Sequence, residues 1–365
     1  MKPSLLIVLT SVLSVLPNEA KSQRSSKTAK LTATKAPPYP TSPKFVNYYV
    51  STKLGIELTR LIDSELSKLS INFYYGNNNN VKLSESINKP TTVFLKKTVA
   101  KNTNELLFFI GYALGLVPEI TRKSSRVYVK VWKENILESD FERYYKEKMY
   151  DSKTIASTSF DHSSKMLSSP YFRSRNKQKT YTFLSDLSQY YEENINRTEF
   201  FSYNDIKRLW YLYCRDKCGK KNDCKNSAYF KNGCNQCQCP KPFAGDKCQH
   251  ILNNDESCGR TQIYFISSFR EIHEKNNIQS FCSYVVKGEN GKKVRFEILN
   301  LTLSREDACK NGFGLEVKYR NDKGAAGLFL CRNLTNISFP ALSNEVYFTF
   351  SDIGKNMLEF RIQEV

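Results

Sequence analysis

The chain has 365 residues, of which 40% are hydrophobic. This content is enough to build buried cores, so a disordered chain is excluded, and the length predicts two or three domains. Lysine and arginine (55) exceed aspartate and glutamate (36), which gives a net charge of +19. A basic surface can bind acidic glycans or anionic membranes. Because the charge is spread along the chain, we expect a solvated surface, with acidic matrix glycans left open as partners. No nucleic-acid motif is present, which predicts no nucleic-acid partner.

The first residues are typical of a secretory leader. Residues 1–22 combine Lys2, an apolar run over Leu5–Leu16 and a small-x-small cleavage site at Ala20–Ser22. An N-terminal membrane anchor is the alternative, but the run is short and a cleavage site follows it. Residues 23–43 are rich in Ser, Thr, Lys and Pro and contain no acidic residue, which predicts a short basic linker. No later run is long enough to span a membrane, so we expect a secreted, extracellular protein.

The cysteines divide the chain into two parts. All 11 cysteines lie from Cys214 onward, so the first half has no disulfide, whereas the second half is built on them. Four Asn-x-Ser/Thr sequons agree with a secretory route and predict glycosylation at Asn196, Asn300, Asn333 and Asn336.

Residues 44–214 are predicted to form the first domain. Apolar or alternating runs predict strands at Val46–Val50, Ile71–Tyr75, Thr92–Leu95 and Arg126–Trp132. Leucines at helical spacing predict an amphipathic helix between Leu54 and Leu69. A further helix is predicted over Ser139–Lys148, with a serine as its N-cap.

An almost completely apolar helix precedes Gly115. Its residues Leu106–Ile110 and Leu114 leave almost no polar face, so the helix must be buried, and it is too short to span a bilayer. Gly115 permits a turn of the backbone, and Pro118 cannot continue a helix. We therefore expect the helix to break at Gly115 and Pro118.

From Phe108 to Arg122, this stretch resembles the zinc-binding helix of the astacin metalloproteases, whose motif is His-Glu-x-x-His-x-x-Gly-x-x-His-Glu-x-x-Arg. The frame of the motif is matched at Gly111, Ala113, Leu114, Gly115, Glu119 and Arg122. The positions of the three zinc ligands hold Phe108, Tyr112 and Pro118, and the general-base position holds Phe109. The resemblance therefore implies an α+β zincin-like domain whose catalytic positions are altered.

The altered positions predict loss of zinc and of catalysis. A catalytic zinc site needs about three protein ligands and a water whose pKa the metal lowers. Phenylalanine and proline have no lone pair to donate, and a neutral tyrosine alone is a poor ligand. The only histidines, His162, His250 and His273, fall in three different segments, which excludes a histidine-based site by their number. We expect no metal and no zinc cofactor.

The resemblance extends beyond the helix in both directions. Phe160–Ser168 is similar to the family's Met-turn segment and keeps Met166, but Ser168 replaces the tyrosine that can ligate zinc in the family. Residues 23–43 stand where the family has a pro-segment and lack its zinc-capping aspartate, so they are interpreted as a vestigial pro-segment. Glu119 and Arg122 are expected to have structural roles.

Asp205–Cys214 resembles the helix that closes the family's domain. In the family, the cysteine at its end pairs with a cysteine at the position of Ser70. Cys214 therefore lacks its family partner, which agrees with the odd number of cysteines. We expect a buried thiol outside any disulfide, and an intermolecular bridge is the alternative.

Residues 215–249 resemble an EGF-like module, with six cysteines in a short loop-rich segment. A module this small needs disulfides because it cannot build a sufficient core. A zinc knuckle is the alternative for Cys-x-x-Cys-x-Cys, but disulfides are favoured in a secreted chain. Spacing does not decide the connectivity; the resemblance implies the pairs Cys218–Cys234, Cys224–Cys237 and Cys239–Cys248.

Residues 258–365 resemble a CUB domain, an all-β sandwich that commonly binds proteins. Its four cysteines suit the bridges Cys258–Cys282 and Cys309–Cys331. Short runs separated by polar turns predict strands at Ile263–Ile266, Ser283–Val286, Val294–Ile298, Leu315–Tyr319, Leu328–Leu330, Val346–Phe350 and Leu358–Ile362. The residues after Cys309 lack the aspartate of calcium-binding CUB domains, so no calcium site is predicted.

Three functions remain for a secreted chain of this organisation. The first is a pseudoprotease that binds an extracellular protein without cleaving it. The second is an active zinc metalloendopeptidase with unorthodox ligands, which would be sensitive to chelators. The third is a structural component of the extracellular matrix. We favour the first, because the zinc-ligand and general-base positions have all changed.

Overall fold

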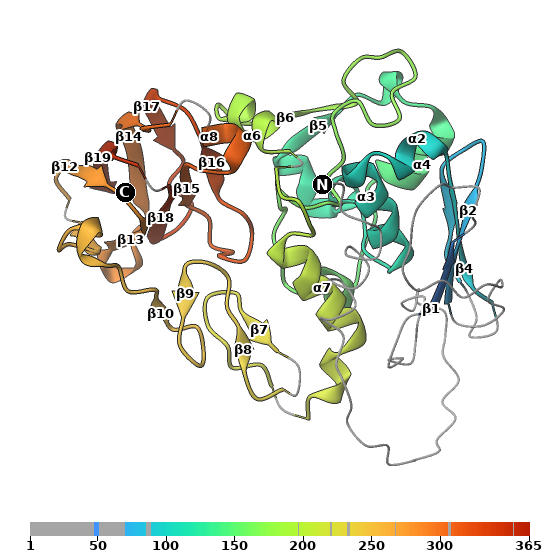
Figure 1. Cartoon of the computed structure of the whole chain (residues 1–365), viewed down its shortest axis with the longest axis horizontal. Coiled ribbons are helices and arrows are strands. Elements are labelled where there is room, and N and C mark those ends of the chain that lie inside the picture. Colours follow the sequence, from blue (N-terminus) through green and yellow to red (C-terminus); the bar gives the residue numbers. More distant parts are fainter. Residues whose placement is uncertain are drawn as a thin grey trace. The chain divides into compact units, whose positions relative to one another are not determined.

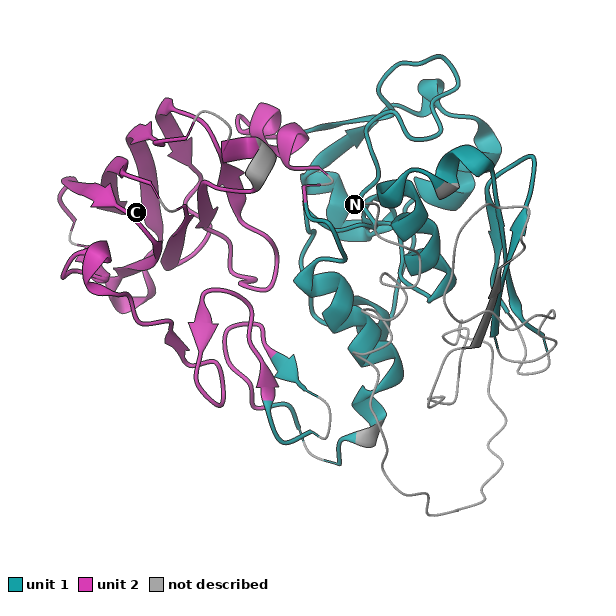
Figure 2. Ribbon diagram, in the orientation of Figure 1, with its two compact units in different colours: residues 1–184, 198–222, 229–236 teal, residues 185–197, 223–228, 237–365 magenta. Residues whose placement is uncertain are grey.

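The computed structural model describes residues 47–50 (backbone only), 70–84, 89–195, 197–219, 221–231, 234–266, 268–305, 308–352 and 354–365. The predicted leader, the linker, the helix over Leu54–Leu69 and the sequon at Asn196 lie outside these residues. The described residues fall into two compact units (Figure 2). Unit 1 comprises the described residues up to 184 together with 198–222 and 229–236, and unit 2 comprises 185–197, 223–228 and 237–365.

A mixed sheet lies on one side of unit 1 (Figure 1). Its described strands follow the order β1 (Asn47–Val50), β2 (Ser70–Tyr75), β4 (Thr91–Leu95) and β3 (Asn80–Lys82). Strands β1, β2 and β4 run parallel, and β3 runs antiparallel to β4. Alternate residues of β4, such as Val93, are fully buried, whereas in β2 the first four residues, up to Phe73, are all buried. The predicted strands at Val46–Val50, Ile71–Tyr75 and Thr92–Leu95 are confirmed.

Helix α3 (Thr103–Ala113) is the predicted apolar helix, and it follows the short helix α2 (Lys97–Ala100). Its N-cap, Asn102, accepts a hydrogen bond from the backbone N–H of Glu105. At the other end, Gly115 has a φ of 92° and the N–H of Leu116 donates to the carbonyl of Gly111 at 2.9 Å. This is a Schellman cap, which favours glycine because of the positive φ. The helix ends at Ala113, and the predicted break at Gly115 is confirmed.

The rest of unit 1 consists of short elements joined by long irregular segments. Their bounds are η2 (Glu119–Thr121), η3 (Lys123–Val127), β5 (Val129–Val131), η4 (Lys133–Asn135), α4 (Glu138–Tyr144), α5 (Ser152–Ile155), β6 (Tyr181–Phe183), α7 (Tyr203–Tyr213), η5 (Arg215–Lys217) and β7 (Tyr229–Phe230). Strands β5 and β6 pair antiparallel. Helix α7 has a complete capping box formed by Ser202 and Asp205.

Two predictions for this region were wrong. The strand predicted over Arg126–Trp132 is reduced to β5, because 3-10 turns extend to Val127 and the N–H of Tyr128 donates to the carbonyl of Ser125. The predicted serine N-cap at Ser139 lies inside α4, whose N-cap position is Leu137 with no side-chain hydrogen bond. In both cases local backbone hydrogen bonds outweigh the sequence pattern.

Unit 2 contains a sandwich of two sheets (Figure 1). The described strands of one sheet are β11 (Ile263–Ile266), β13 (Phe281–Gly288), β18 (Glu345–Ser351), β15 (Leu315–Lys318) and β16 (Leu328–Leu330), in this order. Those of the other are β12 (Glu271–Ile278), β19 (Asn356–Glu364), β14 (Val294–Thr302) and β17 (Leu334–Phe339). Phe348 of the first sheet lies 5.3 Å from Phe296 and 5.0 Å from Phe360 of the second, measured between ring centroids. The predicted all-β sandwich is confirmed.

Strands β12 and β17 were not predicted from the sequence. Each pairs along only one side in the described residues, with β19 and β14 respectively. Their side chains are mostly polar or exposed, as at Glu274, Asn276 and Thr335. An edge strand with few buried residues has no clear apolar alternation, so its pairing depends on the neighbouring strand.

Unit 2 also contains smaller elements. They are α6 (Ser188–Asn194), β8 (Cys237–Gln238), β9 (Phe243–Ala244), β10 (His250–Ile251), η6 (Glu256–Cys258), η7 (Glu289–Gly291) and α8 (Ala308–Asn311). The predicted first domain includes the sequence of α6, but the helix packs in unit 2. The Asn194 side-chain amide donates to the Phe329 carbonyl at 2.9 Å and accepts from its N–H at 3.0 Å. These two bonds cover part of the edge of β16.

The disulfides of the structure are the pairs that the resemblances implied. Cys218–Cys234 lies in unit 1, and unit 2 holds Cys224–Cys237, Cys239–Cys248, Cys258–Cys282 and Cys309–Cys331. Cys214 is 3% exposed and forms no disulfide. None of the helices among the described residues has the length and apolar character needed to cross a membrane.

The close packing at Gly111 yields a stability prediction. A Cβ at this position would lie 2.7 Å from Met166 Sδ and 2.8 Å from a ring carbon of Phe201. We expect Gly111→Ala to lower the free energy of unfolding by about 1–3 kcal/mol, as overpacked core substitutions do. Urea denaturation measures the change. The control is Gly219→Ala, where an added Cβ meets no atom within 4 Å. Equal stability of the two variants would contradict the packing.

Candidate functional site

Three of the four positions that match the family's catalytic residues lie in a group of packed rings. This aromatic cluster comprises Phe108, Phe109, Tyr112, Tyr144 and Phe172. The ring centroid of Phe108 lies 5.0 Å from that of Phe172 and 5.8 Å from that of Tyr144. Phe108 is 2% exposed and Phe109 is fully buried. At these positions the structure has a hydrophobic core.

Helix α3 supplies three of the five rings, and its residues from Leu106 to Gly111 are buried. Phe108 and Tyr112 are one helical turn apart, and their rings are nearly parallel, with 6.4 Å between centroids. Tyr144 comes from the end of α4, and Phe172 from the segment after Met166. No sequence pattern identified these last two residues, because they are remote from α3 in the chain.

A cation covers one side of the aromatic cluster. The Arg173 guanidinium lies 5.4 Å from the ring centroid of Phe172, 5.6 Å from that of Tyr144 and 5.9 Å from that of Phe109. It also donates a hydrogen bond to the carbonyl of Asn79 at 2.9 Å. A positive charge over ring faces is stabilising. A cation at this place would repel a zinc ion.

The donor atoms at these positions do not fit zinc. Phe108, Phe109 and Pro118 offer no ligand atom. Burial and the neighbouring Tyr144 and Tyr150 raise the pKa of Tyr112 to about 12, so its phenol stays neutral at physiological pH. The hydroxyl of Ser168 is buried and has no hydrogen-bond partner among the described residues, but it is also a neutral oxygen. Zinc binds imidazole, thiolate and carboxylate groups, so a neutral phenol and a hydroxyl do not replace them.

The histidines occupy other environments. His162 is 4% exposed, and its ring packs against Phe160, Phe183 and Tyr128 at 5.1–5.8 Å between centroids. His250 and His273 lie in β10 and β12 of unit 2. One group of described residues, Asp223, Cys224 and Cys237, has ligand atoms close enough to hold a metal. Its two sulfur atoms already form a disulfide with each other, so they are not thiolate ligands.

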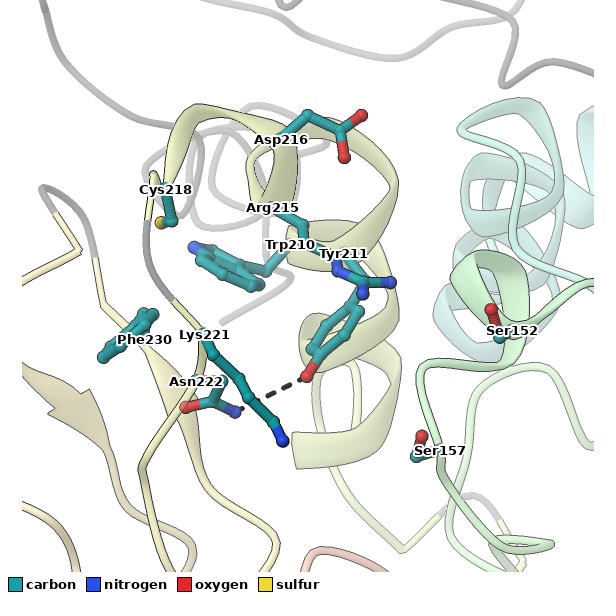
Figure 3. Close-up of a pocket in the computed structure, with 10 residues that line it drawn as sticks. All are labelled: Ser152, Ser157, Trp210, Tyr211, Arg215, Asp216, Cys218, Lys221, Asn222 and Phe230. Carbon is teal, nitrogen blue, oxygen red and sulfur yellow. Dashed lines mark hydrogen bonds between the residues drawn. The ribbon is translucent and has the colours of Figure 1, made fainter.

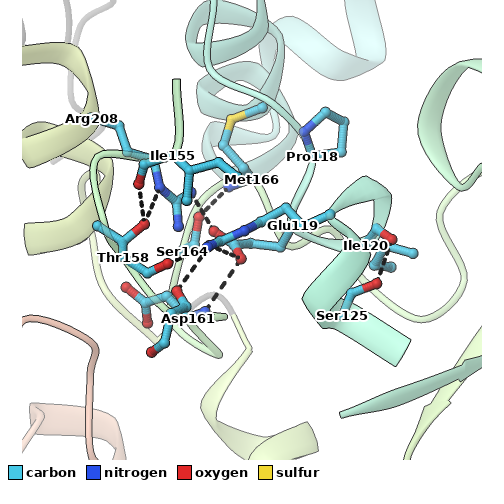
Figure 4. Close-up of polar contacts among 12 residues, drawn as sticks. Pro118, Glu119, Ile120, Ser125, Ile155, Thr158, Asp161, Ser164, Met166 and Arg208 are labelled. Carbon is cyan, nitrogen blue, oxygen red and sulfur yellow. Dashed lines mark hydrogen bonds and ion pairs between the residues drawn. The ribbon is translucent and has the colours of Figure 1, made fainter. Parts of the chain in front are cut away.

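A buried network of charged side chains follows the helix motif, and Glu119 lies at its centre (Figure 4). The Arg122 guanidinium donates to Glu119 Oε2 at 3.0 Å, and the Arg208 guanidinium forms an ion pair with Oε1. All three side chains are at most 2% exposed. Arg208 Nε also donates to the hydroxyl of Thr158 at 2.9 Å. The expected structural roles of Glu119 and Arg122 agree with this burial.

Asp205 and Asp161 extend the network to the Met-turn segment. Asp205 accepts hydrogen bonds from the hydroxyl of Ser164 at 2.6 Å and from the N–H of Lys165 at 2.9 Å. Asp161 accepts from the hydroxyl of Ser202 at 2.8 Å. Burial, and then the charges of Asp205 and Glu119, raise the pKa of Asp161 to about 6. Burial also raises the pKa of Asp205.

Sequence reasoning missed Arg208, Asp161 and Asp205 as members of this network. The Ser-x-x-Asp pattern at Ser202–Asp205 is a capping-box signal that could have identified Asp205. No local signal marks Arg208, because its partner Glu119 is distant in the chain. The network holds three segments of the chain together and contributes no group to the aromatic cluster.

Removal of Arg208 tests the network. We expect Arg208→Met to lower the free energy of unfolding by about 3–5 kcal/mol, because it removes one of the two cations paired with buried Glu119 and the cation beside buried Asp205. Chemical denaturation measures this loss. The control is Lys146→Met, which removes an ion pair with Glu142 whose side chains are 53% and 47% exposed. The control should cost about 1 kcal/mol or less. A similar loss in both variants would show that the buried pair is not essential.

The pKa of Asp161 predicts a pH dependence of stability. Its folded pKa of about 6 lies above the ordinary value of 3.8, so the folded state binds the proton more tightly. Its contribution to stability is complete below pH 3.8 and is lost as the pH rises through about 6. Between about pH 4 and pH 7, we expect the free energy of unfolding of the natural chain to fall by about 2–3 kcal/mol more than that of Asp161→Asn. Urea unfolding at both pH values measures this difference. The exposed control Asp246→Asn should keep the decline. An unchanged pH profile in Asp161→Asn would contradict the assignment.

Comparisons with known proteins identify the first part of the chain. A model of the Astacin peptidase family matches residues 86–214. The zinc metalloproteinase nas-34 of Caenorhabditis elegans is 28% identical over 230 residues, which are 63% of this chain and 37% of the relative. The zinc metalloproteinase nas-36 of Haemonchus contortus is 32% identical over 267 residues, 70% of this chain and 42% of the relative. The chain thus spans about two fifths of the length of these relatives.

Solved structures show weaker similarity. High choriolytic enzyme 1, a hatching enzyme zinc-protease from Oryzias latipes, is 16% identical, with a TM-score of 0.36 over 46% of this chain and 88% of that chain. The CUB1-EGF-CUB2 domain of human MASP-1/3 is 16% identical, with a TM-score of 0.24 over 39% of this chain and 55% of that chain. These scores are too low to assign a fold by themselves. The family match and the nematode relatives confirm the resemblance of the helix motif, and the chain therefore belongs, through residues 86–214, to the astacin family as a zinc-metalloproteinase-like protein.

Proposed function

We propose that this chain is a catalytically inactive astacin-like protein that binds extracellular proteins instead of cleaving them. The observation that supports the proposal is the aromatic cluster. Phe108 and Tyr112 stand at two zinc-ligand positions and Phe109 at the general-base position. Phe108 packs with both Tyr144 and Phe172, Phe109 packs with Phe172, and Tyr112 packs with Tyr144.

Peptide hydrolysis by this family's route requires an activated water and a group that moves its proton. Zinc activates a bound water by lowering its pKa, and a carboxylate at the general-base position accepts the proton. Phe109 has no titratable group, and the neutral phenol of Tyr112 is a poor base. These substitutions remove both requirements from the same helix.

The substitutions favour the fold while they remove the chemistry. Each aromatic side chain that is fully buried contributes about 1.5–3 kcal/mol through removal of apolar surface from water. The ion pairs of Glu119 with Arg122 and Arg208 form between side chains of the chain itself, without any metal. A domain that keeps its structure after losing its catalytic residues suits a binding role, in which only the surface must be preserved.

An extracellular location is part of the proposal. Five disulfides persist best in an oxidising compartment. Two predicted glycosylation sites, Asn333 and Asn336, are exposed. The third described site, Asn300, lies in β14 and is half-buried. These observations support secretion and glycosylation, together with the leader expected from the sequence.

The zinc content of the purified secreted protein tests the proposal. After dialysis against a weak chelator, elemental mass spectrometry should give a value near zero per chain, because the helix offers no suitable ligands. A peptide-cleavage assay with and without a strong chelator should show no difference. An active astacin relative treated in the same way is the positive control.

The other functions predict different outcomes. One zinc per chain with chelator-sensitive cleavage would replace the proposal by an active metalloendopeptidase with unorthodox ligands. Stable association with insoluble matrix, without any soluble partner, would indicate a structural matrix component. A matched variant with Phe108→His, Phe109→Glu, Tyr112→His and Pro118→His restores the motif. If the variant folds and binds zinc while the natural chain does not, the absence of zinc binding in the natural chain is due to these four positions.

A further inference from the structure

A polar pocket lies beside the C-terminal end of α7 in unit 1 (Figure 3). Its volume is about 520 Å³, and it is lined by residues from α7, η5, the segment that follows η5, and the region of α5. A pocket of this size holds a molecule much larger than a single ion. It involves none of the residues of the aromatic cluster.

Arg215 and Lys221 bring two positive charges to this pocket. Arg215 and Lys221 are exposed, and neither forms an ion pair with a carboxylate of the described residues. The acidic residue of the pocket, Asp216, is paired with Lys153 at 2.5 Å, which neutralises its charge. The pocket therefore has two positive charges available for an anionic ligand.

The local sequence adds to this positive charge. Between Arg215 and Lys225 the chain has five basic residues and only two acidic ones. The basic charge is thus concentrated here, in contrast to the even spread suggested by the overall composition. Clustered basic residues attract polyanions at long range.

The other residues of the pocket suit a saccharide. Tyr211 is half-buried, its ring centroid is 5.4 Å from the Arg215 guanidinium, and its hydroxyl accepts from the Asn222 amide at 3.5 Å. Figure 3 shows the Ser152 and Ser157 hydroxyls across the pocket from Tyr211. Hydroxyl and amide groups can bond to sugar hydroxyls, and an aromatic ring can pack against a sugar face.

The pocket is built on a rigid support. Trp210 and Phe230 line it and are each 2% exposed. Cys218 is bound to Cys234, which restrains the backbone close to Arg215 and Lys221. Groups on a restrained backbone lose less conformational entropy when they bind a ligand.

We propose that this pocket binds a sulfated saccharide of an extracellular polysaccharide. Arg215 and Lys221 contact sulfate groups, and Tyr211 packs against a sugar ring. Arginine is well suited to this role because its planar guanidinium forms paired hydrogen bonds with oxyanions. The inference relies on the proposed extracellular location, but not on the absence of peptidase activity.

Binding of a defined ligand tests the proposal. We expect the full chain to bind a heparin-derived hexasaccharide in isothermal titration calorimetry, and the double variant Arg215→Gln/Lys221→Gln to bind at least about tenfold more weakly. Raising the salt concentration should weaken binding to the natural chain more steeply than binding to this variant. Tyr211→Leu should also weaken binding, with the salt dependence unchanged.

Matched controls separate a site from the general positive charge. The double variant Lys123→Gln/Arg175→Gln removes the same charge from exposed positions of unit 1 and should change the affinity less than about twofold. Equal weakening by both double variants would overturn the proposal. Equal binding of an unsulfated hyaluronan hexasaccharide, or full competition by inorganic sulfate at the same concentration, would also overturn it. The assay measures saccharide binding by purified protein. A negative result would therefore overturn the saccharide site without bearing on the proposed extracellular location or on the absence of peptidase activity.

Discussion

The buried carboxylate of Glu119 is the interaction on which unit 1 depends most. Two guanidinium groups neutralise it, one from Arg122 three residues later and one from Arg208 of α7. A carboxylate without water is costly unless it is paired and hydrogen-bonded. Because Glu119 must be paired, the end of the helix motif is linked to the Met-turn segment and to the last helix of the domain. These three segments are distant in sequence, and the charge network holds them in one arrangement.

The aromatic cluster occupies positions at which the astacin motif has catalytic residues. The residues that set the backbone remain, namely Gly111 against Met166 and Gly115 in the helix cap. Two of the three zinc-ligand positions of the motif hold the packed rings of Phe108 and Tyr112. Because burial of rings is favourable and burial of unpaired polar ligands is costly, the altered helix is compatible with the same fold.

The two units are stabilised in different ways. Residues 70–213 contain no cysteine, so this part relies on the charge network and on its apolar core. Unit 2 has four disulfides and the aromatic core of its sandwich, centred on Phe296, Phe348 and Phe360. Small segments such as the one around Cys239 have little core of their own, so covalent bonds replace it. This segment also packs on the sandwich through Phe243, whose ring centroid is 4.8 Å from that of Tyr347.

Local patterns in the chain were enough to predict the apolar helix with its break at Gly115 and most strands of the two units. Each of these features depends on residues that are close together in sequence. Which distant residues meet was visible only in the folded chain: Tyr144 and Phe172 with the helix, Arg208 with Glu119, and Asn194 with the edge of β16. The edge strands β12 and β17 belong to this second group. Their pairing partners and the burial of each charge arise from the packing of the whole chain, which no local pattern contains.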